Sequence, residues 1–459
     1  MNSRWGSLSW LLAGAMVLGA ASAGAQMPPN GSGIVDAPLA NSSAAAPSVP
    51  ADLTSKPTAN DATLTAQEIT LQQLVAIALE RNPAIKSAAE RFQAQRARAP
   101  QARSLPDPMV SGGWMGNITP FSVQQGDPSS YRGLTVSQAF PFPGKLSLRG
   151  KIADREAEAG RWEYEQTERQ VVAEVKTAYY AYFYDSKAIE ITQKNKDLLQ
   201  KLESIAEARY RVGKGIQQDV LRAQVEVARI DQKLIVLEQE EDVARARLNT
   251  LLYQDPESPL PLPAPVKATD FHESLEDLYA MAHANDPGLE QDKRRIESNQ
   301  YTVDLAQKAY KPDFDVAYTY EQRPEMQDMH GVMVGINIPV FFRAKQREGV
   351  IEASHGLNAA RRELDDRLTE VNFEIKQQYL AATAARNLMN LYSKAIVPQS
   401  SLALESSMSA YEVGKVDFLS MLENFVYVLN YEVGYYQELS DYETALAQME
   451  PLVNTDLTE

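Results

Sequence analysis

The sequence contains no cysteine among its 459 residues. This absence excludes disulfide bonds, thiolate nucleophiles, cysteine-ligated zinc and a lipid anchor on an N-terminal cysteine. The four histidines are scattered and form no HExxH pattern, and the chain has no Walker, GxGxxG or GxSxG motif. Carboxylate pairs such as Asp365-Asp366 are typical of solvated helix faces. The sequence therefore predicts a protein that is not an enzyme and has no cofactor.

Positive charge is also scarce, since 45 lysines and arginines stand against 61 acidic residues and give a formal net charge of −16. An acidic chain repels the phosphate backbone, so we expect no nucleic-acid partner. Beyond the first 25 residues, no apolar run approaches the roughly 20 residues that a membrane-spanning helix requires.

The N-terminus is typical of an export signal. Arg4 is the only charge in residues 1–25, an apolar core follows it, and Ala23-Gly24-Ala25 offers small residues for cleavage. The alternative is a buried helix or an uncleaved anchor, but the core is short for a spanning helix. Removal of this segment leaves a net charge of 44 − 61 = −17. An exported chain without a spanning helix is periplasmic, secreted, or placed in the outer membrane as a β-barrel.

The same motifs occur in the same order in both halves of the chain, which indicates a tandem duplication. The offsets between matching positions are 287 − 83 = 204, 331 − 133 = 198 and 414 − 213 = 201. The matching pairs are Asn82-Pro83 with Asp286-Pro287, Gly133 to Pro141 with Gly331 to Pro339, and Tyr210-Arg-Val-Gly213 with Tyr411-Glu-Val-Gly414. The predicted division is a signal peptide at 1–25, a flexible Pro/Ala/Ser-rich leader at 26–66, a first repeat at 67–255, a linker at 256–270, a second repeat at 271–450 and a C-terminal tail at 451–459.

Each repeat contains two segments in which apolar and polar residues alternate, and this period of two predicts β-strands. The expected strands cover about 107–117, 131–141, 313–321 and 331–341. One apolar and one polar face suit a sheet between lipid and a wet lumen. A half-buried sheet in a soluble protein alternates in the same way, so this pattern alone favours neither.

Long helices follow the strands, at about 145–252 and 345–448. The stretch from Lys145 to Tyr210 has no proline, and a helix of that length spans about 100 Å at about 1.5 Å per residue. Helices of this length form coiled-coil pairs or a hollow tube. Four strands per chain cannot close a barrel, so a membrane barrel requires a dimer or a trimer.

With these features, residues 70 to 450 resemble the TolC-type outer-membrane efflux factors. The resemblance rests on the duplication, on the Asn-Pro and Asp-Pro helix boundaries, and on the two Tyr-x-x-Gly turns. Leu105-Pro-Asp-Pro108 and Phe140-Pro-Phe-Pro-Gly-Lys145 are most similar to the heavy-metal efflux branch represented by CusC and CzcC. The resemblance implies a mostly α fold with a transmembrane β-barrel, namely a homotrimer with a twelve-stranded barrel in the outer-membrane lipid and an α-helical periplasmic tunnel. It also implies two partners, a periplasmic adaptor protein and an inner-membrane efflux pump.

The resemblance places the periplasmic aperture near the second Tyr-x-x-Gly turn. Glu423 matches one acidic position of the aperture, whereas Ser420 stands where the family has a second acid. Asp219 and Tyr411 match a family latch, but its arginine position is Val416 here. One hydrogen bond is therefore expected in the latch and no ion pair. At the turns themselves, backbone geometry explains Gly213 and Gly414, and the tips are where an adaptor would dock.

The one cluster suited to a soft metal ion is Met326, Met329 and His330, which lies in the expected loop between the last two strands. A plain exposed loop is the alternative. We expect a passive outer-membrane exit duct of a tripartite efflux system, which carries heavy-metal cations from the periplasm to the exterior. The alternatives are an exit duct for drugs or secreted polypeptide and, in a different class, a soluble periplasmic coiled-coil scaffold.

Overall fold

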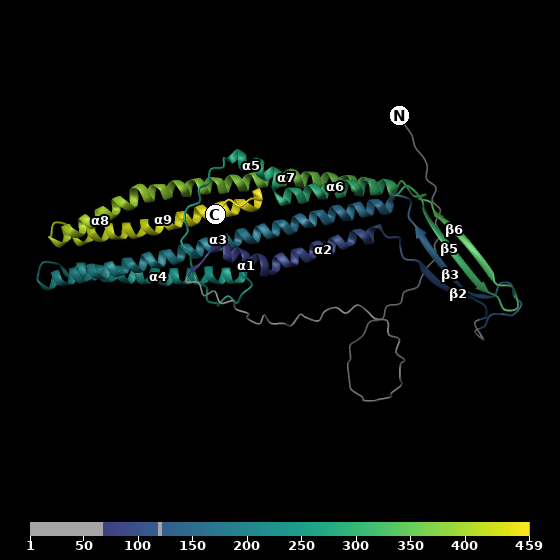
Figure 1. Ribbon diagram of the computed structural model, residues 1–459, viewed down its shortest axis with the longest axis horizontal. Helices are drawn as coiled ribbons and strands as arrows, with labels where there is room; N and C mark the ends of the chain where they lie inside the picture. Colours follow the sequence, from purple (N-terminus) through teal and green to yellow (C-terminus); the bar gives the residue numbers. More distant parts are fainter. Residues whose placement is uncertain (1–67, 118–121, 459) are drawn as a thin grey trace, which may run out of the picture. The chain divides into compact units, whose positions relative to one another are not determined.

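The computed structural model describes residues 68–117 and 122–458. The expected signal peptide at 1–25 and leader at 26–66 lie outside these residues. In the described part, the same series of elements occurs twice: two short helices, two strands, and a long helical hairpin (Figure 1). The duplicated, mostly helical fold expected from the sequence is confirmed.

The elements of the first half are bounded as follows: β1 Glu68–Ile69, α1 Leu71–Arg81, α2 Pro83–Arg103, β2 Met109–Met115, β3 Tyr131–Phe140, α3 Lys145–Arg211 and α4 Gln217–Leu251. Those of the second half are β4 Leu262–Pro263, α5 Leu275–Asn285, α6 Pro287–Lys308, β5 Asp313–Gln322, β6 Met329–Asn337, α7 Gln346–Leu391, the π-helix η1 Tyr392–Ile396, α8 Val397–Glu412 and α9 Phe418–Val453.

The repeated Asn-Pro and Asp-Pro pairs divide the short helices. Asn82 ends α1 and also begins α2, where its side-chain oxygen accepts a hydrogen bond from the backbone N–H of Ala84. Asp286 does the same between α5 and α6, accepting from Leu289 N–H at 2.6 Å. The proline that follows each of them occupies the first helical position, where no backbone donor is needed. Each repeat therefore bends at the same place for the same reason.

The four long strands form one antiparallel sheet in the order β2-β3-β5-β6. Val136 pairs with Tyr318, and Tyr318 pairs with Val332, so these three side chains share one face. Thr135 and Thr319 lie on the other face, where their hydroxyls are 3.0 Å apart. The apolar face is open in the single chain: Val332 is 74% exposed. The sheet thus presents one apolar and one polar surface, with β2 and β6 at its edges.

The last strand ends earlier than the expected range of 331–341. β6 runs from Met329 to Asn337, and a turn that contains Pro339 follows. Proline has no backbone N–H to continue the ladder, which accounts for the end of the strand. At this same end of the sheet, where Asp313 pairs with Asn337, Lys145 Nζ lies 2.8 Å from Asp313 Oδ1 and ties the start of α3 to the start of β5.

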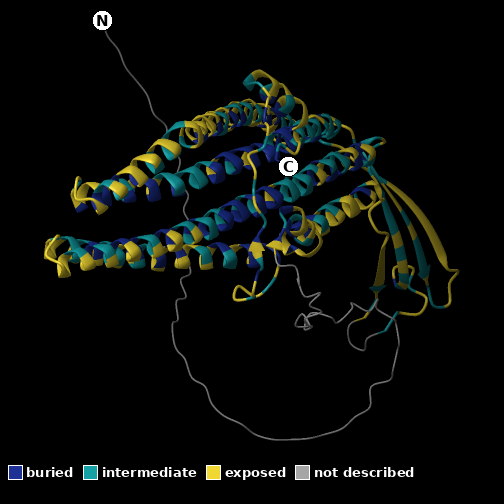
Figure 2. Ribbon diagram, turned by 60° about the vertical axis from the view of Figure 1, so that its left-hand side comes forward, coloured by how far each residue is buried: buried dark blue, intermediate teal, exposed yellow. Residues whose placement is uncertain are grey.

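The helices pack as two hairpins that share a core. α3 runs beside α4, α8 runs beside α9, and α3 contacts α9 (Figure 1). Figure 2 shows buried residues gathered along the facing sides of these helices. The core between the two hairpins is apolar; its members include Leu199, Leu202, Ala223, Leu404, Phe418, Met421 and Phe425. At about 1.5–3 kcal/mol for each large buried side chain, this core holds the two hairpins together.

The segment between the two repeats and the C-terminal tail are both tied to the long helices. The segment between the repeats, which we expected to be a linker at 256–270, contains β4. This short strand pairs in parallel with β1. α9 continues through Pro451 to Val453, past the boundary expected at 450. The buried Lys176 Nζ lies 2.6 Å from Glu450 Oε2 and donates to Thr458 Oγ1, which is close to the end of the chain. These contacts fix the C-terminal residues against α3.

Candidate functional site

The two Tyr-x-x-Gly sequences form the turns at the far ends of the helical hairpins. Gly213 has φ +70° and Gly414 has φ +76°, which are left-handed conformations that favour glycine. Lys214 N–H donates to Arg209 O at 2.9 Å and Gly213 N–H to Tyr210 O at 3.0 Å. The second turn repeats this pair of hydrogen bonds at the equivalent positions. Both ends are therefore Schellman motifs, and the glycines serve the backbone, as expected.

Tyr411 joins the two hairpins just above their turns. Its side chain is 3% exposed, and its ring packs on Phe418 with 5.5 Å between centroids. The guanidinium carbon of Arg209 lies 4.5 Å from the centre of the same ring. Arg209 also donates to the backbone oxygen of Tyr411 and, at 3.4 Å, to that of Lys214. One arginine from the first hairpin thus contacts both turns.

Asp219 lies in the first turn of α4, close enough to Tyr411 and Arg209 to interact with both electrostatically. Burial raises the pKa of Asp219, and the guanidinium groups of Arg222 and Arg209 oppose this rise. Burial and the Asp219 charge raise the pKa of Tyr411. The expected hydrogen bond between the two is not formed, because the buried Tyr411 hydroxyl has no hydrogen-bond partner in the described residues.

The expected arginine position, Val416, carries no charge, but Tyr411 does contact an arginine. Arg209 supplies it from the last turn of α3 instead of from the second Tyr-x-x-Gly segment. Sequence reasoning missed this residue because the family pattern points to one position only. The available signal was Arg209-Tyr210 directly before the first turn, where a cation favours the negative end of the helix dipole.

Ser420 and Glu423 are both exposed at the start of α9. Asp417 caps this helix by accepting from Ser420 N–H at 3.3 Å. The hydrogen bonds from Ser420 lower the pKa of Asp417. Positions 420 and 423 are three residues apart, so they share one helix face, away from the buried Met421 and Leu422. The structure therefore puts both aperture candidates on an uncovered surface near the second turn.

The methionines and the histidine suggested for a soft metal ion lie at the far end of the sheet. Met329 and His330 are consecutive in β6, so their side chains point to opposite faces. His330 Nδ1 lies 2.7 Å from the Tyr318 hydroxyl, and Met326 lies in the preceding turn. Among residues 68–117 and 122–458, no group of three or more histidine, aspartate or glutamate side chains is arranged to hold a metal ion.

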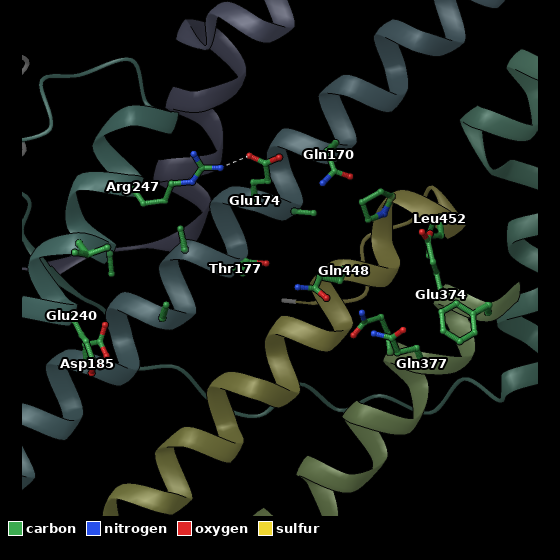
Figure 3. Close-up of a pocket in the computed structure, with 18 of the residues that line it drawn as sticks. Gln170, Glu174, Thr177, Asp185, Glu240, Arg247, Glu374, Gln377, Gln448 and Leu452 are labelled. Carbon is green, nitrogen blue, oxygen red and sulfur yellow. Dashed lines mark hydrogen bonds and ion pairs between the residues drawn. The ribbon is translucent and has the colours of Figure 1, made fainter. Parts of the chain in front are cut away.

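A hollow of about 750 Å³ lies between α3, α4, α7 and α9 (Figure 3). Its lining is rich in carboxylates and amides, and its one arginine, Arg247, pairs with Glu174 at 2.9 Å. Asp185 and Glu240 lie close together in it. Burial, together with the charges of Glu240 and Glu241, raises the pKa of Asp185 to about 7. Carboxylates outnumber the single arginine in the lining, so the surface of this hollow is acidic.

No helix within residues 68–117 and 122–458 is both long enough and apolar enough to cross a membrane. A comparison with curated proteins gave no match.

The chain is similar to several solved structures. The outer-membrane channel OprN has a TM-score of 0.72 and 20% identity, covering 83% of this chain and 89% of that one. VceC from Vibrio cholerae has a TM-score of 0.71 and 17% identity, with coverage of 84% and 96%. CusC has a TM-score of 0.72 and 14% identity, with coverage of 83% and 91%.

The sequence itself matches a known family along most of its length. The profile of the outer membrane efflux proteins matches residues 74–252 and 278–454, one segment in each repeat. These segments contain both turns, the Arg209–Tyr411 contact and the exposed start of α9. The chain belongs to the outer membrane efflux protein family and is an efflux channel protein of the outer membrane.

Proposed function

We propose that three copies of this chain form the outer-membrane exit duct of a tripartite efflux system, and that the two helical turns form its periplasmic mouth. The observation that carries the proposal is the Arg209–Tyr411 contact, because it holds the tips of the two hairpins together. A contact of this kind closes the mouth when it is made and opens it when it is broken. Cation–π contacts contribute about 0.5–2 kcal/mol, which a docking partner can readily offset.

The four-stranded sheet supports the trimer. β2 and β6 are its edge strands, and an unpaired edge is unfavourable in lipid. Three copies joined edge to edge provide twelve strands, within the size range of closed outer-membrane barrels. Channels of this family are trimers that work with an adaptor and an inner-membrane pump. Val212 and Val413, exposed by 68% and 69% at the two turns, offer an apolar surface for the adaptor.

The cargo we propose is cationic, with heavy-metal cations as the first class to test. Three copies of Glu423 around one axis would repel one another and attract cations. The acidic hollow lined by Asp185 and Glu240 continues this preference. Drug-like organic cations are the second candidate. The exposed Tyr427, one helical turn from Glu423 on α9, favours them because an aromatic ring attracts organic cations.

The test of the mouth uses Glu423→Gln in planar bilayers, with hexamminecobalt(III) as the blocking cation. We expect the blocking concentration to rise about tenfold, because each of the three subunits loses an exposed charge interaction worth roughly 0.5 kcal/mol. The control is Glu238→Gln, an exposed glutamate on α4, which should leave the block unchanged. Equal block in wild type and Glu423→Gln would contradict the position that we assign to Glu423.

A further inference from the structure

We propose that Tyr392, Tyr427 and Tyr431, the tyrosine ladder, form a binding site for flat aromatic organic cations on the inner wall of the duct, with Glu423 as its charged end. The proposal rests on the proposed function in one respect, namely that the Glu423 face of α9 lines the passage. It adds a ligand class and a set of residues that an acidic mouth alone does not imply.

The three rings form a continuous aromatic surface. The rings of Tyr427 and Tyr431 are stacked, with 6.1 Å between centroids and 19° between planes. Tyr431 and Tyr392 follow, with 6.2 Å between centroids and 41° between planes. Tyr427 is 51% exposed, so the end of the ladder nearest Glu423 is open to solvent. Stacked or tilted rings at these distances leave an aromatic face for another flat ring.

Two unusual backbone features put Tyr392 in this position. Tyr392 begins the π-helix η1, which ends directly before α8, and π-helices in α-helical segments are frequent at functional sites. Across from it, α9 has a glycine at position 434. A Cβ added to Gly434 would lie 3.3 Å from Tyr392 Oη, which is tighter than ordinary contacts. The shifted helical register and the missing side chain together allow Tyr392 to lie against α9, next to Tyr431.

Charge selects the ligand. Glu423 and Tyr427 are four residues apart, so they are neighbours on the exposed face of α9, and Tyr431 continues the same row. A ligand with a positive charge near a flat ring system can place its charge by Glu423 and its rings on the tyrosines. A hydrated metal ion interacts with the carboxylate but has no ring to stack. The ladder therefore distinguishes organic from inorganic cations.

The test compares two blockers of the channel formed by the full-length mature protein in planar bilayers: ethidium, a flat aromatic cation, and hexamminecobalt(III), an inorganic one. In Tyr427→Leu and Tyr431→Leu, we expect the ethidium concentration for half block to rise about fivefold to tenfold. Block by hexamminecobalt(III) should stay unchanged in both variants. Tyr427→Phe keeps the ring and should keep ethidium block. Tyr253→Leu, an exposed tyrosine after α4, is the matched control.

A second variant tests the backbone arrangement without removing a ring. Gly434→Leu should push Tyr392 away from α9 and weaken ethidium block by a few fold, again without effect on hexamminecobalt(III). If ethidium block is the same in wild type and in the Tyr427 and Tyr431 variants, the ladder proposal is overturned while the channel stands. If the wild-type protein does not conduct, the proposed function itself fails, which is a different result.

Discussion

Arg209 shows how one side chain can control contact between two helical hairpins. It stacks on the Tyr411 ring, donates to the backbone of both turns, and lies near Asp219. The Tyr411 hydroxyl lacks a hydrogen-bond partner within residues 68–117 and 122–458, so the ring and backbone contacts of Arg209 carry the interaction.

The first prediction concerns Arg209→Gln. Loss of the guanidinium should weaken the contact between the hairpins by about 1 kcal/mol and increase the mean single-channel conductance. Planar-bilayer recordings measure this directly. Arg211→Gln is the control, because Arg211 lies two residues further on and pairs with Glu207 within the same helix. A conductance that rises equally in both variants would show that net charge, rather than the Tyr411 contact, sets the opening.

The second prediction concerns Asp185, whose pKa is raised to about 7 by burial and by neighbouring carboxylates. A carboxyl with a higher pKa in the folded chain binds its proton more tightly there, so stability falls as pH rises from about 4 to 7. Asp185→Asn should stabilise the protein at pH 8, by at least about 1.4 kcal/mol, which corresponds to one pKa unit. It should have little effect at pH 4.

Thermal unfolding followed by helical circular dichroism at both pH values tests this prediction. Asp197→Asn serves as the control, because Asp197 is an exposed aspartate on the same helix, α3. The idea fails if Asp185→Asn shifts the unfolding midpoint equally at pH 4 and pH 8, since the effect would then not come from ionisation.

Some residues of the candidate site could be predicted from the sequence, and others could not. The resemblance to the efflux family pointed to Glu423 and Ser420, and the structure puts both on the exposed face of α9. Arg209 was not found, because the residue that meets Tyr411 comes from the other repeat, 202 positions away. The sequence shows that Arg209 lies at a helix end, but which residue of the other repeat it meets depends on how the hairpins pack.

Among the elements, the turns follow most directly from sequence. Both are Schellman motifs with glycine in the left-handed position, and a helix end needs that conformation to satisfy its last carbonyls. The strands were equally readable, since the period-two alternation matches the faces fixed by the sheet register. The end of β6 and the two-residue strands β1 and β4 were less readable, because such short segments have no period.

The third prediction compares two glycines. Gly213→Ala should destabilise the hairpin by about 1 kcal/mol, because φ +70° disfavours a Cβ even where space is open around it. Gly349→Ala, within α7 and also in open space, should instead stabilise by about 0.5–1 kcal/mol through higher helix propensity. Denaturant unfolding measures both. A stabilising effect of Gly213→Ala would mean that the turn has a different conformation in solution.

At the scale of the whole molecule, the duplication explains how the two repeats join and which strand edges remain unpaired in a single chain. Each repeat supplies one strand pair and one helical hairpin, and the two join along α3 and α9 and along β3 and β5. One chain leaves β2, β6 and the apolar face of the sheet uncovered. Sequence periodicity predicted these elements, but it left the number of copies open between two and three, because edge pairing alone does not fix how many copies close a ring.

The central claim is that three copies of this chain form a conducting channel. The most direct test is reconstitution of the purified mature protein in planar bilayers, after its mass in detergent has been measured by light scattering. We predict a particle with the mass of three chains and discrete conductance steps that hexamminecobalt(III) reduces. A protein that remains soluble without detergent, has the mass of one chain and produces no conductance would contradict the account.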